Sequence, residues 1–299
     1  MHIPVLIDEV ISYLRPELGG VFLDGTVGMG GHSEKLIKSG AGEVFAIDRD
    51  RETLAETVER LQDLPIQFFH TSFDKLGEAI SAEKMGEFDG ILLDLGISSR
   101  QLDDCSRGFS FQLDGPLDMR MDRSDENLTA AEIVQNWGES ELEQVIRQFG
   151  EERYAGRIAR AIVRERNSGG LKTTRELESV IFHATPARHR HQRIHPATRT
   201  FQALRIAVND EMQALSRGLG QLLPWLKDGG RIAVISFHSL EDRIVKHQFR
   251  QWSSEKIGRI ITKKPIMASE DEISRNSRSR SAKLRIFEKG LLDGRSNTS

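Results

Sequence analysis

The sequence predicts an α/β fold, a doubly wound and mostly parallel sheet of the Rossmann-like kind with an inserted all-helical domain. Three observations predict it. Apolar runs typical of strands alternate with amphipathic helical patterns over the first third of the chain, as in parallel sheets. Helical patterns alone then follow for a long stretch, before strand patterns return near residue 231. A glycine-rich loop also follows the first strand pattern, as in nucleotide-binding sheets.

The expected elements follow in chain order. Strand patterns lie at residues 21–24, 44–48, 66–70 and 88–94, with helical patterns between them at 33–38, 51–62 and 75–82. Helical patterns without strands follow at 129–137, 140–149, 152–167, 174–184 and 200–215. Strand patterns resume at 231–236, 259–262 and 284–287, and the last two would close the sheet with an antiparallel edge. We therefore predict a discontinuous domain of residues 1–104 and 216–299, interrupted by a helical domain of residues 105–215.

The glycine loop indicates an adenosine-type ligand. Asp24 ends the first strand pattern, and a helical pattern begins at Ser33. Glycine lets the backbone approach a ligand closely, and the start of a helix offers unpaired N–H groups to an anion. Asp48, at the end of the second strand pattern, can accept hydrogen bonds from ribose hydroxyls. The glycines of the loop are Gly25, Gly28, Gly30 and Gly31.

The spacing of these glycines distinguishes between adenosine ligands. It does not match the Gly-x-Gly-x-x-Gly pattern of dinucleotide sites, and no Gly-Lys-Ser/Thr phosphate loop occurs. An NAD-dependent oxidoreductase and an ATPase are therefore disfavoured. An acid ahead of a Gly-x-Gly-Gly run suits a ligand that carries a carboxylate and an ammonium group. The sequence predicts S-adenosylmethionine (SAM) as the cofactor, with a tight turn that binds nothing as the alternative.

The composition limits which binding partners and which cellular compartment the protein is expected to have. The net charge is −3, from 42 basic and 45 acidic residues, but residues 184–209 hold five arginines, three histidines and no acid. Residues 253–299 hold 11 Lys/Arg against 6 Asp/Glu. Two basic segments on an acidic body suit a polyanion, and a solvated charged surface is the alternative for the tail. The single cysteine, the lack of a signal-peptide pattern and the lack of an apolar membrane span predict a cytoplasmic protein without a membrane partner.

The position of the insert predicts its role. In open α/β sheets, ligands bind beyond the carboxyl ends of the strands. The insert leaves the fourth strand pattern at Asp94 and returns to the fifth, so it would lie over that edge of the sheet. We therefore expect the insert to cap the cofactor crevice and to present a substrate to it.

Seven sequence blocks resemble the bacterial 16S ribosomal RNA cytosine-N4 methyltransferase family, in order and with no motif missing. The resemblance implies the fold of class I SAM-dependent methyltransferases with a helical insert. It also implies transfer of a methyl group to the exocyclic N4 of a decoding-centre cytidine, in the 16S rRNA of the small ribosomal subunit. The blocks are HIPVL (2–6), DGTVGMGGHS (24–33), DLGISS (94–99), RGFSF (107–111), GPLDMRM (115–121), HPATR (195–199) and SFHSLED (236–242).

The same resemblance implies the residues that hold SAM. An acid near the methionine ammonium and an aromatic face beside the adenine agree with the chemistry of the ligand. A core position for Phe73, a turn acid at Asp94 and a loop role for His32 are the structural alternatives. The implied residues are Gly30, Gly31 and His32 at the methionine end, Asp48 at the ribose, Phe73 beside the adenine, and Asp94 and Gln101 completing the pocket.

For catalysis we expect direct in-line methyl transfer without a covalent enzyme intermediate. The N4 lone pair of cytosine is delocalised, so a hydrogen-bond acceptor on N4–H is needed, and Asp94, Ser236 and His238 are the candidates. The alternative for His238 is a residue that precedes a helix whose N-cap is Ser239. Methylases of DNA amino groups usually carry an Asn/Asp/Ser-Pro-Pro-aromatic motif, which Asp94-Leu95-Gly96-Ile97 replaces here, so Phe109 or Phe111 would supply the stacking. Cys105, flanked by acids, is interpreted as incidental.

The arginine-rich segment predicts RNA contacts. Histidines 183, 189, 191 and 195 lie among arginines with no Cys or acid, so we predict no metal site. Arginines would position RNA phosphates while histidine and aromatic faces stack exposed bases. A non-catalytic RNA-binding or ribosome-assembly factor on a SAM fold remains the alternative function, and a homodimer remains open. The predicted RNA-binding residues are Arg188, Arg190, Arg193 and Arg199.

Overall fold

The computed structural model describes residues 4–80, 86–124 and 126–290. Three parts of the sequence-based predictions lie outside these residues. They are residues 2 and 3 of the HIPVL block, residues 81 and 82 of the helix predicted at 75–82, and residues 291–299 of the basic tail. The chain forms two compact units, which are Met1–Gly96 with Met212–Ser299, and Ile97–Glu211. Each unit is described separately below.

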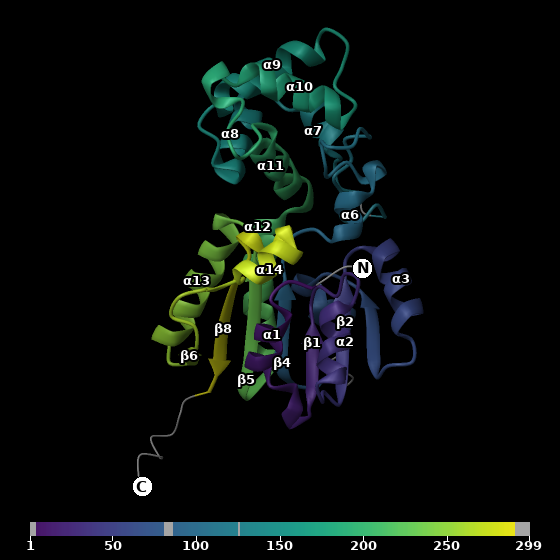
Figure 1. Cartoon of the computed structure of the whole chain (residues 1–299), viewed down its shortest axis with the longest axis vertical. Helices are drawn as coiled ribbons and strands as arrows, with labels where there is room; N and C mark the ends of the chain where they lie inside the picture. The colour runs from purple at the N-terminus through teal and green to yellow at the C-terminus, as the bar shows by residue number, and fades with distance from the viewer. Residues whose placement is uncertain (1–3, 81–85, 125, 291–299) are drawn as a thin grey trace. The chain divides into compact units, whose positions relative to one another are not determined.

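The first unit is built on one sheet whose strand order is β3-β2-β1-β4-β5-β8-β6, with β7 paired to β8 (Figure 1). Neighbouring strands from β3 to β5 run parallel, whereas β8 is antiparallel to β5, β6 and β7. This topology confirms the predicted α/β fold and its antiparallel edge. The strands are β1 (Val21–Asp24), β2 (Glu43–Asp48), β3 (Ile66–His70), β4 (Phe88–Asp94), β5 (Leu226–Ser236), β6 (Gly258–Ile260), β7 (Ile266–Met267) and β8 (Lys283–Lys289).

Helices cover both faces of this sheet, because successive strand residues point to opposite sides. Leu23, Phe45 and Leu93 enter a core shared with α4, α12 and α13. Phe22, Val44 and Leu92, one residue away in each strand, enter a second core with α1, α2 and α3. The helices of this unit are α1 (Ile7–Leu14), α2 (Gly31–Lys38), α3 (Arg51–Leu61), α4 (Leu76–Ala79), α12 (Glu211–Leu222), α13 (Ser239–Ser254) and α14 (Glu270–Arg275).

The second unit is helical and has its own core, which runs from Phe109 to Val208. Four of its helices, α8 to α11, form the teal and green cluster at the top of Figure 1. Pro116 and Thr173 form an isolated antiparallel β-bridge, the one such bridge among the described residues of this unit. The helices are α6 (Ser99–Asp103), α7 (Ala130–Asn136), α8 (Glu139–Gly150), α9 (Ala155–Arg166), α10 (Thr174–Ala184) and α11 (Ala197–Asn209).

The units divide at positions that differ from the predicted boundaries of 104/105 and 215/216. Ile97 and Leu102 pack against the core of the second unit, so the division comes earlier, after Gly96. Leu215 and Leu219 of α12 are buried in the core of the sheet, so the chain rejoins the first unit at Met212.

Two local predictions were wrong, and one helix was missed. The expected helix at 200–215 is two helices, because Asp210 adopts a left-handed conformation with φ 50° and ends α11. The Ser/Arg-rich stretch Ser274–Ser281, whose composition predicts a mobile basic loop, forms the end of α14 and a 3₁₀ turn at Ser277–Ser281 in which Ser279 is buried. The short helix α1 was not predicted.

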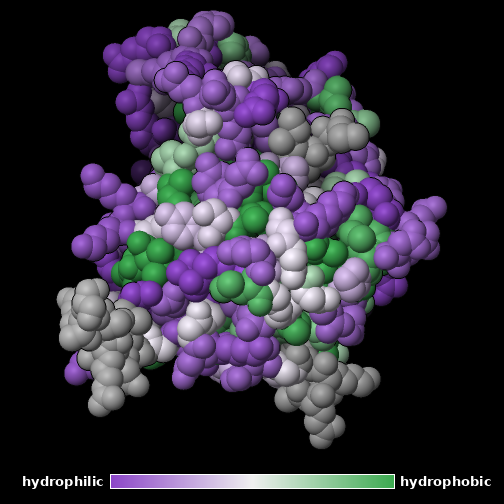
Figure 2. Space-filling view, turned by 60° about the horizontal axis from the view of Figure 1, so that its bottom comes forward, coloured by the Kyte–Doolittle hydropathy of each residue, from purple (hydrophilic) through white to green (hydrophobic). Residues whose placement is uncertain are grey.

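The surface carries scattered apolar groups. Figure 2 shows one face on which hydrophobic residues occur in small separate groups among hydrophilic ones. Across the described part of the chain, no helix combines the length and the apolarity needed to cross a bilayer. The predicted homodimer stays a prediction.

Candidate functional site

The candidate cofactor site is built around the loop that joins β1 to α2. Gly28 and Gly30 have φ angles of 49° and 73°, a region that favours glycine. The loop is anchored to β2 because Val27 N–H donates to the Ile47 carbonyl at 2.9 Å. It is anchored to α3 because the Thr57 hydroxyl donates to the Gly28 carbonyl at 2.6 Å. No side chain caps the start of α2, so its N-terminal N–H groups can hold an anion such as a carboxylate.

Asp48, at the end of β2, directs its carboxylate toward this loop. Oδ2 accepts a hydrogen bond from Gly28 N–H at 2.7 Å, and Oδ1 accepts one from Asp50 N–H at 2.8 Å. Burial raises the pKa of Asp48, and these two hydrogen bonds oppose the rise. A carboxylate offers about four lone pairs, so each oxygen keeps capacity for one ribose hydroxyl.

Asp94, at the end of β4, lies beside the same loop. Its backbone N–H donates to the Thr26 hydroxyl at 2.6 Å, which ties the end of β4 to the loop. Its Oδ2 lies 3.6 Å from Nδ1 of His32. The other ring nitrogen of His32 lies 3.0 Å from the Val5 carbonyl. Among the described residues, none donates a hydrogen bond to Oδ1 of Asp94, which is shielded from solvent. The structure therefore brings together Asp94 and His32, both predicted for the methionine end.

Several acidic residues share this end of the sheet. Asp24 is 1% exposed, and burial raises its pKa to about 6 although Ser33 and Thr26 donate hydrogen bonds to it. Burial also raises the pKa of Asp94 well above its usual range, and the negative charges of Asp24 and Glu241 raise it further. A shielded carboxylate without a donor is unfavourable in its charged form. An ammonium group would supply both donor and charge, so the residues fit the methionine end of SAM.

Phe73 lies close to the glycine loop, as an adenine contact requires. A Cβ built on Gly25 would stand 3.4 Å from the Phe73 Cβ. On its other side the ring packs on α12, where a Cβ on Gly218 would stand 2.4 Å from ring atom Cδ2. The next residue, Asp74, is buried and pairs with Arg217 at 2.9 Å. Phe73 therefore packs partly against the core while staying beside the loop.

Ser236 and His238 follow the end of β5, and both side chains are engaged. The Ser236 hydroxyl donates to the Lys283 carbonyl of β8 at 3.4 Å. His238 is the N-cap of α13, because Glu241 N–H donates to its Nδ1 at 3.4 Å. The prediction of Ser239 as the N-cap was wrong, since Ser239 is already the first helical residue. Nε2 of His238 lies 3.2 Å from the Glu241 carboxylate, so both ring nitrogens face Glu241.

Gln101, the remaining predicted cofactor residue, lies in the second unit on α6. Its Oε1 accepts a hydrogen bond from Ser98 N–H at 3.0 Å, and its own N–H donates to the Ser98 hydroxyl at 3.2 Å. This reciprocal pair is a capping box. Gln101 belongs to the second unit, so its place in the SAM pocket stays a prediction.

The four predicted RNA-binding arginines also lie in the second unit. Arg188, Arg190 and Arg193 belong to the connection between α10 and α11, and Arg199 lies on α11. Arg188, Arg193 and Arg199 are exposed. Arg199 lies 3.8 Å from the Glu152 carboxylate, so part of its charge is balanced.

Aromatic rings and histidines pack together beside these arginines. His195 stacks on Phe111 with ring centroids 4.8 Å apart, and on Phe182 at 6.1 Å. The Arg190 guanidinium lies 5.3 Å from the centre of the Phe182 ring. It also donates to the His183 carbonyl at 2.9 Å. The segment thus offers cations and flat faces together, the combination expected of a surface for exposed bases.

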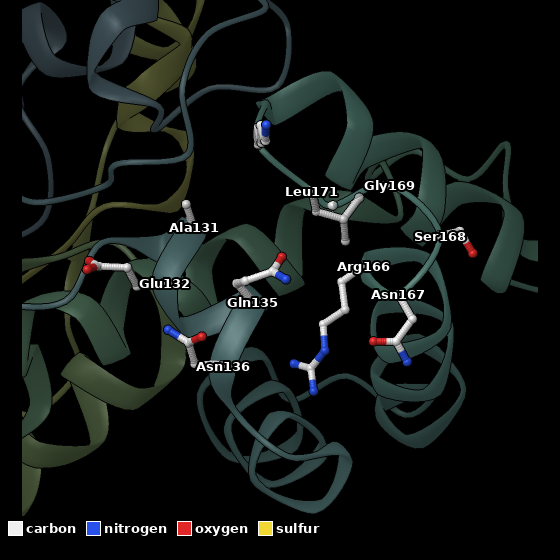
Figure 3. A pocket seen from close by; sticks show the side chains of 11 residues that line it. Ala131, Glu132, Gln135, Asn136, Arg166, Asn167, Ser168, Gly169 and Leu171 are labelled. Carbon is white, nitrogen blue, oxygen red and sulfur yellow. The ribbon is translucent and has the colours of Figure 1, made fainter.

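A groove of about 640 Å³ lies in the second unit, between α7 and the turn after α9 (Figure 3). The sequence did not indicate it. Figure 3 shows the side chains of Gln135, Asn167 and Arg166 around it. The Arg166 guanidinium donates to the Val134 and Trp137 carbonyls at 2.9 and 2.6 Å, which satisfies the end of α7. Because its one guanidinium serves the helix end, we assign the groove no reaction.

Two residues of the site were missed by sequence reasoning. Thr26 holds Asp94 in place, and Thr57 holds Gly28. Thr26 could have been found, because it lies inside the glycine motif between an acid and the first apolar residue. Thr57 gives no such signal, since a threonine in the middle of an amphipathic helix has many structural roles.

Comparison with known proteins identifies the family. Residues 1–290 match the model of the MraW methylase family. The chain is 49% identical to the ribosomal RNA small subunit methyltransferase H of Synechocystis sp. over 96% of this chain and 93% of that protein. It is 48% identical to the protein of the same name from Trichlorobacter lovleyi, over 96% and 98%.

Among solved structures, an rRNA methylase from Streptococcus thermophilus matches with a TM-score of 0.46 and 10% identity, over 97% of this chain and 100% of that one. This similarity is too distant to bear on function. The family membership expected from the seven blocks is confirmed by the family model and by both relatives. The chain therefore belongs to the MraW methylase family, and its cofactor is S-adenosylmethionine.

Proposed function

We propose that this protein methylates the exocyclic N4 of a specific cytidine in the decoding centre of 16S rRNA, in the small ribosomal subunit. The observation that carries the proposal is the Asp94 carboxyl beside the glycine loop, in the block that resembles the cytosine-N4 family. The relatives named ribosomal RNA small subunit methyltransferase H support the choice of substrate.

The residues of the first unit have separable tasks in this proposal. The N-terminus of α2 holds the cofactor carboxylate, Asp94 accepts from its ammonium group, Asp48 accepts from the ribose hydroxyls, and Phe73 borders the adenine. When bound, SAM supplies a methyl group already activated on a sulfonium. The protein therefore mainly has to align donor and acceptor. No cysteine nucleophile is needed, since attack comes directly from N4.

Proton removal from N4 is the step that needs an acceptor. Asp94, Ser236 and His238 are the proposed candidates, and their contacts favour Asp94. The Ser236 hydroxyl donates to β8, and Nδ1 of His238 accepts in the helix cap. Asp94 Oδ1 has no described donor, so the carboxylate keeps capacity to accept from N4–H as well as from the cofactor ammonium group. We therefore propose that the N4 proton passes to the Asp94 carboxylate and that Ser236 and His238 position the strand ends.

The two units divide the remaining work. We propose that the sheet unit binds SAM and that the helical insert recognises RNA through Arg188, Arg190, Arg193 and Arg199. A non-catalytic assembly factor is the competing function. It shares the basic segment and the glycine loop, so only turnover separates the two.

The test is transfer of labelled methyl from SAM to small ribosomal subunits from cells that lack this protein. Digestion to nucleosides and mass spectrometry then identify the product. We expect label in N4-methylcytidine. Binding of SAM without label in any nucleoside would favour the assembly factor, and label in another nucleoside would refute the proposed acceptor atom.

A further inference from the structure

Two exposed arginines of the second unit converge on a single histidine nitrogen. Nη2 of Arg153 lies 2.5 Å from Nε2 of His189, and Nε of Arg188 donates to the same atom at 3.0 Å. Guanidinium nitrogens only donate, so Nε2 of His189 carries its lone pair there. The pKa of His189 is lowered by loss of hydration and by the charges of Arg153 and Arg188. A neutral imidazole therefore holds two cations close together.

The acids nearby do not neutralise this pair of cations. Glu152 is the neighbouring carboxylate, but its Oε1 accepts from Tyr154 N–H at 2.8 Å and its Oε2 lies 3.8 Å from Arg199. Within the described chain, no carboxylate lies within ion-pair distance of Arg153 or Arg188. Elsewhere on this unit, exposed arginines of α8 and α9 do form ion pairs. These pairs are Arg147 with Glu143 and Arg160 with Glu139.

Adjacent like charges repel, so this arrangement is stabilised when an anion joins it. Guanidinium groups match the oxygens of a phosphate, and two of them can grip neighbouring oxygens. The site is also part of a folded framework, because Tyr154 is the N-cap of α9 and Arg188 and His189 lie in the 3₁₀ turn Ala187–His189. A phosphate would therefore meet donors that are already placed.

Flat faces next to the cations indicate which phosphate-bearing ligand fits. The Arg153 guanidinium lies 4.5 Å from the Tyr154 ring centre, and the Tyr154 and His189 rings are 5.6 Å apart. Phe182, on α10, is flanked by Arg190 at 5.3 Å and His191 at 5.8 Å. Base-paired RNA hides its base faces, whereas unpaired bases stack on aromatic and guanidinium planes.

We propose that Arg153, Arg188, His189 and Tyr154 form a binding site for one phosphodiester and its neighbouring unpaired base in an RNA strand. The site rests on the proposed function, since it takes rRNA as the substrate. It adds Arg153 and Tyr154, which lie outside the arginine-rich segment that the sequence singled out.

The first test titrates the full-length protein with a labelled single-stranded RNA over a series of salt concentrations. Loss of one phosphate contact lowers the slope of log affinity against log salt by about 0.7 for a single strand. Because both arginines contact the same phosphodiester, we expect a decrease of at most that size for Arg153→Gln and for Arg188→Gln. Arg160→Gln is the matched control, because it removes one charge from α9 at an arginine already paired with Glu139. Slopes for Arg153→Gln and Arg188→Gln equal to that of the control would overturn the proposal.

The aromatic part has its own variant. Tyr154→Leu is expected to weaken binding of the single strand about tenfold and to leave binding of a duplex of equal length nearly unchanged. Tyr154→Phe keeps the ring and should retain the affinity. Equal losses on single strand and duplex would show that the site does not select unpaired RNA.

Two further measurements keep the result interpretable. A bound phosphodiester offsets the charges of Arg153 and Arg188, so NMR titration should show a higher pKa for His189 with the single-stranded RNA than without it. An unchanged pKa would overturn the site even if a variant misfolds. SAM binding and methyl transfer by the same variants separate this proposal from the proposed function. RNA binding through this site without any methylation of cytidine would refute the proposed function and leave the proposed binding site in place.

Discussion

Replacing Asp94 by asparagine tests the cofactor assignment most directly. The substitution keeps the shape of the side chain and removes its charge, at an oxygen to which no described residue donates. Hydrogen bonds that involve a charged group contribute about 1.5–3 kcal/mol. Because about 1.4 kcal/mol corresponds to a tenfold change, Asp94→Asn should weaken SAM binding roughly 10- to 150-fold. Titration calorimetry with SAM at pH 7.5 gives the dissociation constants.

The same variant should have the opposite effect on the stability of the ligand-free protein. The pKa of Asp94 is raised in the folded state, so the folded protein keeps a proton that the unfolded chain has already released. Stability therefore falls as pH rises through the interval between the unfolded and folded pKa values. Asp94→Asn removes this loss, and its melting temperature without SAM should exceed that of the wild type at pH 7.5.

Asp89→Asn is the matched control. It makes the same chemical change at the other end of β4, where the carboxylate accepts from Val21 N–H and from Lys227, each at 2.8 Å. We expect wild-type affinity for SAM and a lower melting temperature. If Asp94→Asn binds SAM within twofold of the wild type, Asp94 does not hold the ammonium group and the reasoning fails.

Three other predictions follow from single contacts. Gly218→Ala places a Cβ 2.4 Å from the Phe73 ring, so it should cost about 1–3 kcal/mol of stability and weaken SAM binding. If calorimetry shows an unchanged affinity for SAM, Phe73 does not line the adenine pocket. His238→Ala should lower the stability of the protein by about 1 kcal/mol, because it removes the N-cap of α13. His238→Asn should restore the cap and keep kcat, and an equal loss of kcat in both variants would make His238 the proton acceptor. Between pH 4 and 6, Asp24 should contribute a fall in stability of about 2 kcal/mol to urea unfolding, because folding raises its pKa from 3.8 to about 6. A fall that persists in Asp24→Asn would assign it to other groups.

The inner strands β1 and β4 were predictable because they are buried on both faces. Such strands read as continuous apolar runs, and both were predicted with the bounds that the structure has. The edge strand β3 is only partly buried, but its bounds were also predicted. The break between α11 and α12 was not predictable. Amphipathic periodicity continues across it, and the left-handed conformation of Asp210 leaves no trace in that pattern.

The candidate site was predictable in its residue types but not in its electrostatics. The acid-glycine motif located the loop, and strand ends located Asp48 and Asp94. The sequence could not show that Asp94 Oδ1 is shielded or that Asp24 lies near enough to raise its pKa, because both depend on how β1 and β4 pair. The N-cap of α13 was misplaced by one residue, since the SFHSLED block contains both a serine and a histidine able to cap.

The pairing of β4 with β5 has a consequence for how the chain folds. These neighbouring strands are separated in the chain by the whole insert, so their register requires closure of a very long loop. The entropic cost of closing a flexible loop grows with its length, and an insert with its own core can shorten that loop by folding first. During synthesis, β4 remains an unpaired edge until β5 has emerged from the ribosome. Premature pairing of that edge with another chain is the hazard this topology creates.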